Sequence, residues 1–316
     1  MFSRPLSAAL GLVVALAASA AVANDGVELK YKFVKGDKMV LRAKSEVKQT
    51  QTIMGQTIDN TIESEAISTV TVEDVDEKGN FHLGLKGERL KVKMNVGPLG
   101  EYVFDSQSSE RDKSSVLGGA LTPLYERLGG ITFQATIKPD GEVVDVKGYV
   151  DQIRDLLEGN PLTAQFANGG TDEAAKLGLE QQFPRIGGKA VKPGDTWDRP
   201  YDLELPKIGK VKGKSMYRYV GPDQVGDKET AKIEVTSDGS IDINLEMMGV
   251  KVTGTLNVTS GNSTIQFDPV AGRILVHDDT VVMAGDLNVD ANGMNIPIRQ
   301  EQTMKTKVEY LDKIPE

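Results

Sequence analysis

The residues best suited to chemistry are a histidine and the acidic side chains that follow it near the C-terminus. His277 precedes Asp278 and Asp279, and His82 is the only other histidine. Neighbouring residues on a strand point to opposite faces, so only His277 and Asp279 could converge, as a base with an orienting acid or as metal ligands. No third group follows from spacing, and a histidine at an exposed strand end is the alternative interpretation.

A second group of polar residues resembles half of a calcium-binding loop. Counting Asn288 as the first ligand puts Gly293 sixth, as such loops require, but Arg299 then stands twelfth, where a bidentate glutamate belongs. Strand alternation explains the run equally well, because its polar side chains would share one solvent face. The candidate metal ligands are therefore His277, Asp279, Asp286, Asn288 and Asp290. We predict no bound metal and no cofactor.

Sequence motifs of common enzymes are missing. The chain contains no Gly-x-Ser-x-Gly elbow and no His-Glu-x-x-His pair. Residues 209–215 resemble a phosphate-binding loop, but three residues separate the glycines where four are needed, and the segment follows a strand pattern. No catalytic residue is assigned, and enzymatic activity stays open.

Charge and composition restrict the class of partner. The chain has 37 basic and 46 acidic residues, a net charge of −9, and only 5% aromatic residues. This balance argues against a nucleic-acid partner, since no dense basic face offsets the acidic excess. The absence of cysteine excludes disulfides and thiolate metal sites.

The N-terminus is typical of an exported protein. Arg4 precedes an apolar segment over residues 6–18 and the small-residue sequence Ala21-Val22-Ala23. We predict a secretory signal peptide over residues 1–23, cleaved before Asn24, which places the mature protein in the periplasm or outside the cell. An uncleaved anchor is the alternative, but its apolar core is shorter than the ~20 residues that a spanning helix needs. No transmembrane segment is expected after cleavage.

Long strands dominate the rest of the chain. Residues 38–75 alternate between apolar and polar side chains and break only at Met54-Gly55, which predicts two strands of roughly 15 residues joined by a tight turn. A strand over residues 29–33 should precede them. The alternation slips at Gly87-Glu88, which predicts a β-bulge. Strands of this length favour a large curved antiparallel sheet.

The middle of the chain changes character. Apolar residues at helical spacing predict helices over residues 116–128 and 148–158, and a third helix capped by Thr171 and ending near Phe183-Pro184. A short hairpin should lie over residues 131–146. Strands return between residues 196 and 311, with turns expected at Pro222-Asp223 and at Ser237-Asp238-Gly239.

Matching turn sequences indicate an internal duplication. Lys35-Gly36-Asp37 enters the first long strand and Lys192-Pro193-Gly194-Asp195 enters the second half, while Met-Gly pairs join long strands in both. We predict an α+β fold, mainly β, with long curved strands in two related lobes and a central helical insert, similar to a partly open barrel covered by helices. The lobes span residues 24–105 and 191–316, the insert spans 106–190, and residues 24–316 could equally form one continuous domain.

The turn and strand sequences also resemble a known family. The segments that carry the likeness are Val34-Lys35-Gly36-Asp37, residues 191–197 and residues 267–273. They resemble an uncharacterised family of exported bacterial β-rich domains, with a similar order of features over nearly all of the mature chain. The resemblance implies secretion and β-rich structure, and it supplies no catalytic residue.

Three functions fit these patterns. The first is a non-enzymatic envelope protein that holds a lipid or hydrophobic peptide against a curved sheet, broadly similar to bacterial lipoprotein carriers. The second is a structural or adhesive cell-envelope module with a filled core that meets a protein partner. The third is a hydrolase with an unrecognised site. The candidate ligand-binding residues are Met39, Leu41, Ile58, Ile62, Trp197 and Met247.

Overall fold

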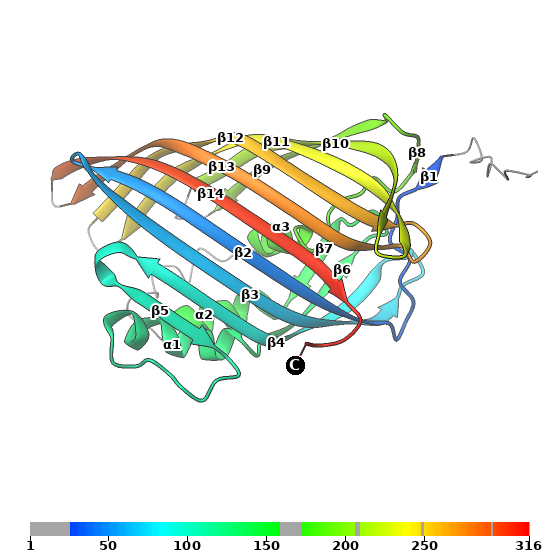
Figure 1. The fold of residues 1–316 in the computed structure, drawn as a ribbon, viewed down its shortest axis with the longest axis horizontal. Helices are drawn as coiled ribbons and strands as arrows, with labels where there is room; N and C mark the ends of the chain where they lie inside the picture. The colour runs from blue at the N-terminus through cyan, green and yellow to red at the C-terminus, as the bar shows by residue number, and fades with distance from the viewer. Residues whose placement is uncertain (1–25, 159–171, 206–208, 248–249, 292, 316) are drawn as a thin grey trace, which may run out of the picture.

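The computed structural model describes residues 26–158, 172–205, 209–247, 250–291 and 293–315, and these are dominated by one antiparallel sheet (Figure 1). The sheet has 12 strands within the described residues, in the order β7-β6-β4-β3-β2-β14-β13-β12-β11-β10-β9, with β5 paired to β4. The first half contributes β2 (Lys38–Ile53), β3 (Gln56–Val75), β4 (Phe81–Val96), β5 (Glu101–Asp105), β6 (Thr132–Ile137) and β7 (Val143–Lys147). The second half contributes β9 (Thr196–Leu205), β10 (Gly209–Val225), β11 (Lys228–Met247), β12 (Val250–Asp268), β13 (Arg273–Ala291) and β14 (Met294–Leu311). A separate pair joins β1 (Val27–Glu28) to β8 (Ala190–Val191). The predicted mainly β fold with long antiparallel strands is confirmed.

The hairpin of β2 and β3 forms because both strands alternate and their connection can turn sharply. Met54 and Gly55 have φ angles of 53° and 82°. Two positive φ values at the central positions of a two-residue loop match the right-handed twist of the flanking strands. The register then pairs Met39 with Val70 and Ala43 with Ala66, so the apolar residues of both strands share one face.

Three breaks in the alternating sequence pattern lie within continuous strands of the structure. The slip at Gly87-Glu88 is confirmed as a register shift, since Ser68 faces Gly87 while Ile67 faces Arg89. The turn expected at residues 237–239 is wrong, because β11 runs through it with a shift in its pairing to β12. The turn expected at residues 222–223 is also wrong, since β10 continues to Val225. Polar and glycine residues in a long curved strand absorb curvature without ending the ladder.

The two halves of the chain share one sheet. β14 pairs with β2 over most of its length, from Ile298 opposite Ile53 to Leu311 opposite Val40. The last strand therefore continues the ladder of the first long strand. The domain boundaries predicted from sequence stay a prediction, although the lobes are not separate sheets.

The predicted duplication has a geometric counterpart in two turns. Gly36 donates its backbone N–H to the Val72 carbonyl, and Gly194 donates to the Tyr219 carbonyl, both at 2.8 Å. The φ angles of these glycines are 94° and 96°. The entry to β2 beside β3 thus has the same structure as the entry to β9 beside β10.

Glycines permit strong coiling of the sheet. A Cβ atom on Gly254 would lie 2.3 Å from the Asp286 carbonyl oxygen, and one on Gly285 would lie 2.0 Å from that of Thr255. Gly254 also has a φ angle of 146°, which L side chains rarely adopt. These close approaches between β12 and β13 bend the strands. The sheet curls without closing, since β7 and β9 do not pair with each other in the described residues.

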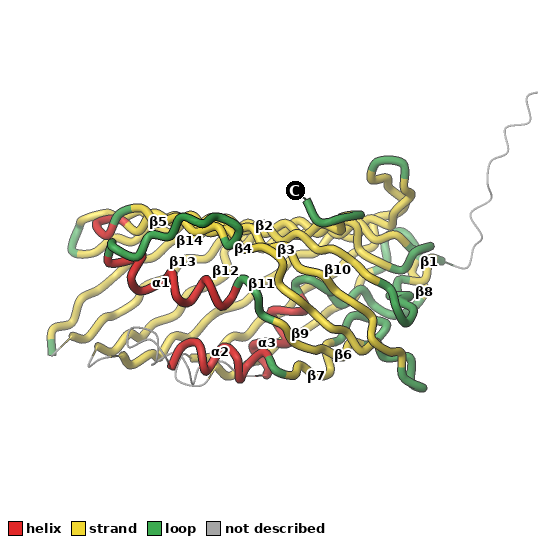
Figure 2. Tube along the Cα trace, turned by 90° about the horizontal axis from the view of Figure 1, so that it is seen from below, coloured by secondary structure: helices red, strands yellow, loops and turns green. Residues whose placement is uncertain are grey.

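Three helices lie on the concave side of the curled sheet: α1 (Val116–Leu128), α2 (Tyr149–Glu158) and α3 (Asp172–Glu180) (Figure 2). The predicted helices at 116–128 and 148–158 are confirmed, while Thr171, the expected cap of α3, lies outside the described residues. α1 packs on β4 and β5 through Leu121 and Tyr125, and the Tyr102 hydroxyl lies 3.0 Å from that of Thr122. α3 contacts both β7 and β9. It therefore fills the opening between the two sheet edges.

One end of the interior is filled by aromatic side chains. The strand expected over residues 29–33 is wrong, because this segment is irregular and plugs the curled sheet with Leu29, Tyr31 and Phe33. Tyr31 packs edge-on against Phe267 with ring centroids 5.9 Å apart, and its hydroxyl donates to the Pro184 carbonyl at 3.1 Å. Alternating apolar residues are compatible with a plug as well as with a strand. Each such buried side chain contributes about 1.5–3 kcal/mol.

Candidate functional site

Two cavities lie beneath the curved sheet, one on each side of α3. The first cavity, about 490 Å³, lies between the inner faces of β2, β3, β4, β6 and β7 and the three helices. The second cavity, about 560 Å³, lies between α3 and the inner faces of β9 to β14. Both volumes fall within the roughly 300–1,000 Å³ that small-molecule pockets occupy.

Small side chains create the first cavity. Ala43 lies opposite Ala66, and Ser68 lies opposite Gly87, on the face where larger residues would reach the helices. Leu41, one of the candidate ligand-binding residues, borders the same space. The curved sheet therefore leaves a void where its inner residues become small.

The helix side of the first cavity is apolar. Its walls there are Leu128, Ile131, Phe133, Tyr149, Val150, Ile153, Ala175 and Leu179. Gly178 of α3 is exposed and borders the cavity, and a Cβ atom built on it meets no described atom within 4 Å. The side-chain carbonyl of Gln182 is buried and accepts no hydrogen bond from any described residue. The helix side thus combines apolar walls with one acceptor that has no donor among the described residues.

The second cavity is polar at one end and apolar at the other. Along the inner face of β13, His277 and Asp279 are followed by Val281 and Met283. Neighbouring strands follow the same order, because Ser263 lies opposite Asp279 and Val258 lies opposite Met283. The polar end is next to the filled core.

Hydrogen bonds and ion pairs engage most polar groups of the second cavity. The Ser263 hydroxyl donates to Asp279, and the Ser215 and Ser237 hydroxyls lie 2.9 Å apart. Arg185 pairs with Glu180 at 2.7 Å. Burial raises the pKa of Tyr217, which also borders this cavity, to about 12, so its phenol stays protonated at neutral pH.

His277 is held at the end of α3. Its Nδ1 atom lies 3.0 Å from the Gln181 carbonyl oxygen, so this nitrogen carries the proton of the neutral ring. Burial lowers the pKa of the imidazole, although the hydrogen bond to Gln181 and the carboxylates of Asp279 and Asp278 oppose that shift. The sequence-based pairing of His277 with Asp279 on one face is reproduced, since both line the second cavity.

The arrangement around His277 is not that of a nucleophile with its base. The nearby Ser263 hydroxyl donates to Asp279, and the imidazole donates to the Gln181 backbone carbonyl. A nucleophilic hydroxyl would instead donate to the histidine nitrogen. His82, on β4, lies 3.1 Å from the Thr136 hydroxyl outside both cavities.

The residues of the calcium-like run lie on the opposite face of β13 from His277. Asn288 donates to Asn295 at 3.0 Å, and Asp290 accepts from the Gly293 backbone N–H at 3.0 Å. Asp286 lies opposite Arg299. Within the described ranges no group of three or more acidic or histidine side chains could hold a metal ion. Asp286, Asn288 and Asp290 thus lie apart from His277 and Asp279.

The candidate ligand-binding residues occupy different surroundings. Met39 and Leu41 are buried in the filled core, whereas Ile58 is half-buried and Ile62 is 39% exposed on the same face of the hairpin. Trp197 stacks on Tyr217 with ring centroids 5.4 Å apart. Met247 ends β11, and its side chain lies outside the described ones. Leu41 alone of the described candidates lines a cavity directly.

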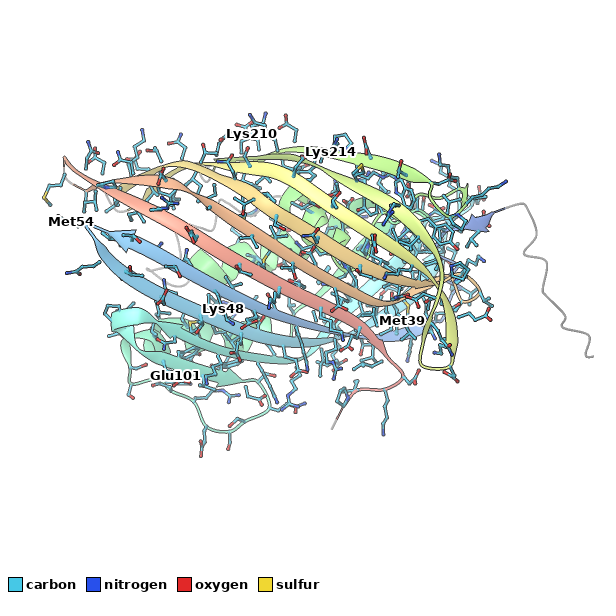
Figure 3. The ribbon with its side chains drawn as sticks, turned by 45° about the horizontal axis from the view of Figure 1, so that its top comes forward. Met39, Lys48, Met54, Glu101, Lys210 and Lys214 are labelled. Atoms are coloured by element: carbon cyan, nitrogen blue, oxygen red, sulfur yellow. The ribbon has the colours of Figure 1, made fainter. Side chains whose placement is uncertain are left out.

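Lysines of β10 lie on the convex face of the sheet (Figure 3). Lys210 and Lys214 project from the outer surface of β10 in Figure 3, and they pair with Asp202 and Asp198. β10 is not an edge strand, because β9 pairs with it. The lysines form cross-strand ion pairs.

Several residues of the cavities have no sequence signal of their own. The alanines and glycines of the first cavity and the serines of the second are ordinary in a strand pattern. Arg199 is different, because it is a charged residue on the otherwise apolar face of β9, between Trp197 and Tyr201, and its Nε atom is buried without an acceptor among the described residues.

Comparisons with known proteins give distant structural neighbours. A search of curated proteins finds no match. An outer membrane channel from Pseudomonas putida F1 is 7% identical with a TM-score of 0.25, covering 89% of this chain and 97% of its own. OccK11 (OpdR) from Pseudomonas aeruginosa is 8% identical with a TM-score of 0.20, covering 90% and 100%. A DUF1329 family protein from Desulfovibrio piger is 7% identical with a TM-score of 0.16, covering 87% of each chain.

Among the described residues, no helix has the length and apolar character needed to cross a membrane.

The comparison with family profiles gives a match over much of the chain. The profile described as "Family of unknown function (DUF6263)" matches residues 78–274, more than half of the chain and the part that builds β4 to β12. The chain therefore belongs to DUF6263, a family of unknown function.

Proposed function

We propose that this protein is a non-enzymatic binder of an apolar ligand, which it holds in the first cavity between the curved sheet and the helices. The observation that carries the proposal is a cavity of about 490 Å³ whose helix side is apolar and whose sheet side is lined mainly by small or apolar residues. Lys86 and Arg89 also border the sheet side, where they pair with Glu88 and Asp105. Leaving such space empty costs stability, because the side chains around it lose their packing partners. A ligand would restore those contacts.

A lipid acyl chain fits the cavity better than a hydrophobic peptide. A peptide backbone brings one amide donor and one carbonyl acceptor per residue, and each needs a partner when buried. The described walls offer few such partners, with Ser68 and Gln182 the uncharged polar side chains among them. An acyl chain makes no such demand.

The filled core favours the second function, a structural or adhesive envelope module, only in part. That function requires a filled interior, and the aromatic cluster around Tyr31 and Phe33 fills one end. The two cavities beside α3 count against it. For a hydrolase, the hydrogen bonds of His277 and Ser263 offer no pairing of base and nucleophile.

Adjacent residues of α3 provide a matched test. Gly178 faces the first cavity and Leu177 faces the second. Gly178→Phe should fill the first cavity and weaken binding of the neutral fluorescent probe N-phenyl-1-naphthylamine by at least about tenfold, roughly 1.4 kcal/mol. Leu177→Phe should leave the affinity for this probe unchanged.

The proposal fails if the wild-type protein does not bind the probe, or if both variants bind it as well as the wild type does. Native mass spectrometry of protein purified without detergent provides a second measurement. It should detect a co-purified lipid with the wild type and lose it with Gly178→Phe.

Export is part of the same proposal. The apolar segment and small residues before Asn24 support a cleaved signal peptide. Expression of the full chain in a Gram-negative host should give periplasmic protein whose N-terminal residue, by Edman sequencing, is Asn24. An intact Met1 on the soluble protein would contradict export by this route.

A further inference from the structure

We propose that the second cavity is a separate site for an amphiphile whose anionic headgroup, a carboxylate or a phosphate, binds Arg199 and whose apolar chain lies along β12 to β14. The inference goes beyond the acyl-chain site of the first cavity, from which α3 separates it. It depends on a difference between the polar groups at one end of the cavity: the Arg199 Nε donor has no acceptor among the described residues, whereas Asp279 and Glu180 accept hydrogen bonds.

Arg199 has donors to spare. Its Nε atom is buried without an acceptor among the described residues, and the nearest carboxylate, that of Asp140, lies 3.6 Å from its terminal nitrogen. That distance exceeds a normal hydrogen bond. A buried donor without a partner costs about 1–3 kcal/mol, so an acceptor supplied by a ligand would be favourable. A planar guanidinium suits the paired oxygens of a carboxylate or phosphate.

The residues beside Arg199 also favour an acceptor. Ser215 lies directly opposite Arg199, and Ser237 lies opposite Ser215. Their two hydroxyls lie 2.9 Å apart, so one proton serves the bond between them and the second can point to a ligand. Lys176 of α3 lines the same cavity, and no carboxylate among the described side chains pairs with it. These four side chains can therefore hold an anionic oxygen.

The carboxylates at this end are already compensated. Asp279 accepts from Ser263, and Glu180 accepts from Arg185 at 2.8 Å. Glu173, one turn before Lys176, is exposed. Asp140, the carboxylate nearest to Arg199, accepts from the Glu142 backbone N–H at 3.0 Å. Repulsion of an anionic headgroup is therefore weakened where Arg199 would bind it, because these carboxylates have donors.

The other end of the cavity suits a hydrocarbon chain. Val258, Val281, Met283 and Met304 line it, and Met283 continues into a buried apolar cluster with Leu256 and Leu287. Val281 and Leu287 are six residues apart on one strand, which corresponds to about 20 Å. Methionine side chains adapt readily to a flexible chain. The cavity thus places an anion site at the head of a long apolar strip.

The single tryptophan provides a local reporter. Trp197 stacks on Tyr217, which lines the second cavity, and it lies two residues from Arg199 on the same face of β9. The probe is 11-(dansylamino)undecanoic acid, compared with its methyl ester, which has the same chain and no charge. Energy transfer from Trp197 to the dansyl group reports binding of the probe, and the α3 variants show which cavity holds it.

We expect the wild-type protein to bind the acid at least tenfold more tightly than the ester. Arg199→Gln should abolish that preference, whereas Arg218→Gln, on the exposed outer face of β10, should preserve it. Dodecyl phosphate and dodecanoate serve as competitors that show which headgroup is preferred. Inorganic phosphate competing as well as dodecyl phosphate would overturn the role of the chain.

Equal affinity of the wild type for acid and ester would overturn the anion site without any variant having to fold. Leu177→Phe should block the acid and Gly178→Phe should not, which is the reverse of the pattern for the neutral probe. Loss of acid binding with Gly178→Phe alone would assign the amphiphile to the first cavity and refute the second site. Failure of either site is therefore distinguishable from failure of the other.

Discussion

At the scale of single residues, His277 is the side chain whose charge the fold controls most directly. It is buried at the end of α3, donates to the Gln181 carbonyl, and has the carboxylates of Asp278 and Asp279 nearby. Burial outweighs these neighbours and lowers the pKa of the imidazole below its ordinary value of 6.5. The folded protein therefore prefers the neutral ring.

This shift predicts a pH dependence of stability. The unfolded chain takes up the proton of His277 before the folded chain does, so its contribution is complete above about pH 6.5 and is lost as the pH falls towards the lowered pKa. In urea unfolding, His277→Gln should lose less free energy of unfolding than the wild type between pH 7.5 and pH 5.0.

His82→Gln is the control for that experiment, because the side chain of His82 is 42% exposed. A smaller loss of stability with His277→Gln than with His82→Gln assigns the acid sensitivity to the buried ring. If His277→Gln and the wild type lose stability in parallel, the acid sensitivity comes from other groups.

At the scale of elements, a glycine of the sheet and a glycine of α3 have opposite effects on stability. Gly254 lets β12 approach β13 so closely that any Cβ atom would meet the Asp286 carbonyl oxygen. Gly178 has no such neighbour and lies within a helix, where glycine costs backbone entropy without a compensating contact. One glycine is required by the curvature, and the other keeps the first cavity open.

The two positions predict stability changes of opposite sign. Gly254→Ala should destabilise the protein by about 1–3 kcal/mol, because it forces a strained backbone and a close contact. Gly178→Ala should stabilise it by up to about 1 kcal/mol, since alanine favours the helix and its Cβ meets open space. Urea unfolding followed by circular dichroism measures both. A stabilising Gly254→Ala would contradict the role of this residue in coiling the sheet.

At the scale of the whole molecule, the pairing of β2 with β14 makes the fold depend on both ends of the chain. Residues more than 200 positions apart lie side by side, such as Arg42 and Glu309, whose side chains form an ion pair. Long-range pairing of this kind must form before much of the interior is buried. Neither half has a complete sheet without the other.

This arrangement predicts that fragments 24–190 and 191–316 will not fold alone. Each would expose a long strand, β2 or β14, whose unpaired backbone groups promote aggregation. Size-exclusion chromatography should show aggregates for each fragment and a monomeric complex after co-expression. A fragment that unfolds cooperatively by itself would instead support the two lobes as independent domains.

Local patterns in the sequence are sufficient for much of the secondary structure. The helix at residues 116–128 and the strands at 196–205 and 294–311 follow from periodicity, and the bulge at Gly87 follows from a slip in alternation. Predictions from periodicity were wrong where one sequence pattern is compatible with two different structures. The segment 29–33 alternates like a strand but serves as a plug, and the polar break at 237–239 is a bulge.

What the sequence determined by itself is the mainly β character, the long hairpins and the matching turns at Gly36 and Gly194, because each depends on residues close along the chain. Only the tertiary structure decided that both halves form one curled sheet, that α3 fills the gap between β7 and β9, and that cavities flank it. The pairing of the two halves and the cavities beneath the sheet depend on contacts between residues far apart in the sequence. The significance of Ala43 opposite Ala66, or of an Arg199 Nε atom without an acceptor among the described residues, depends on the opposite wall of the cavity.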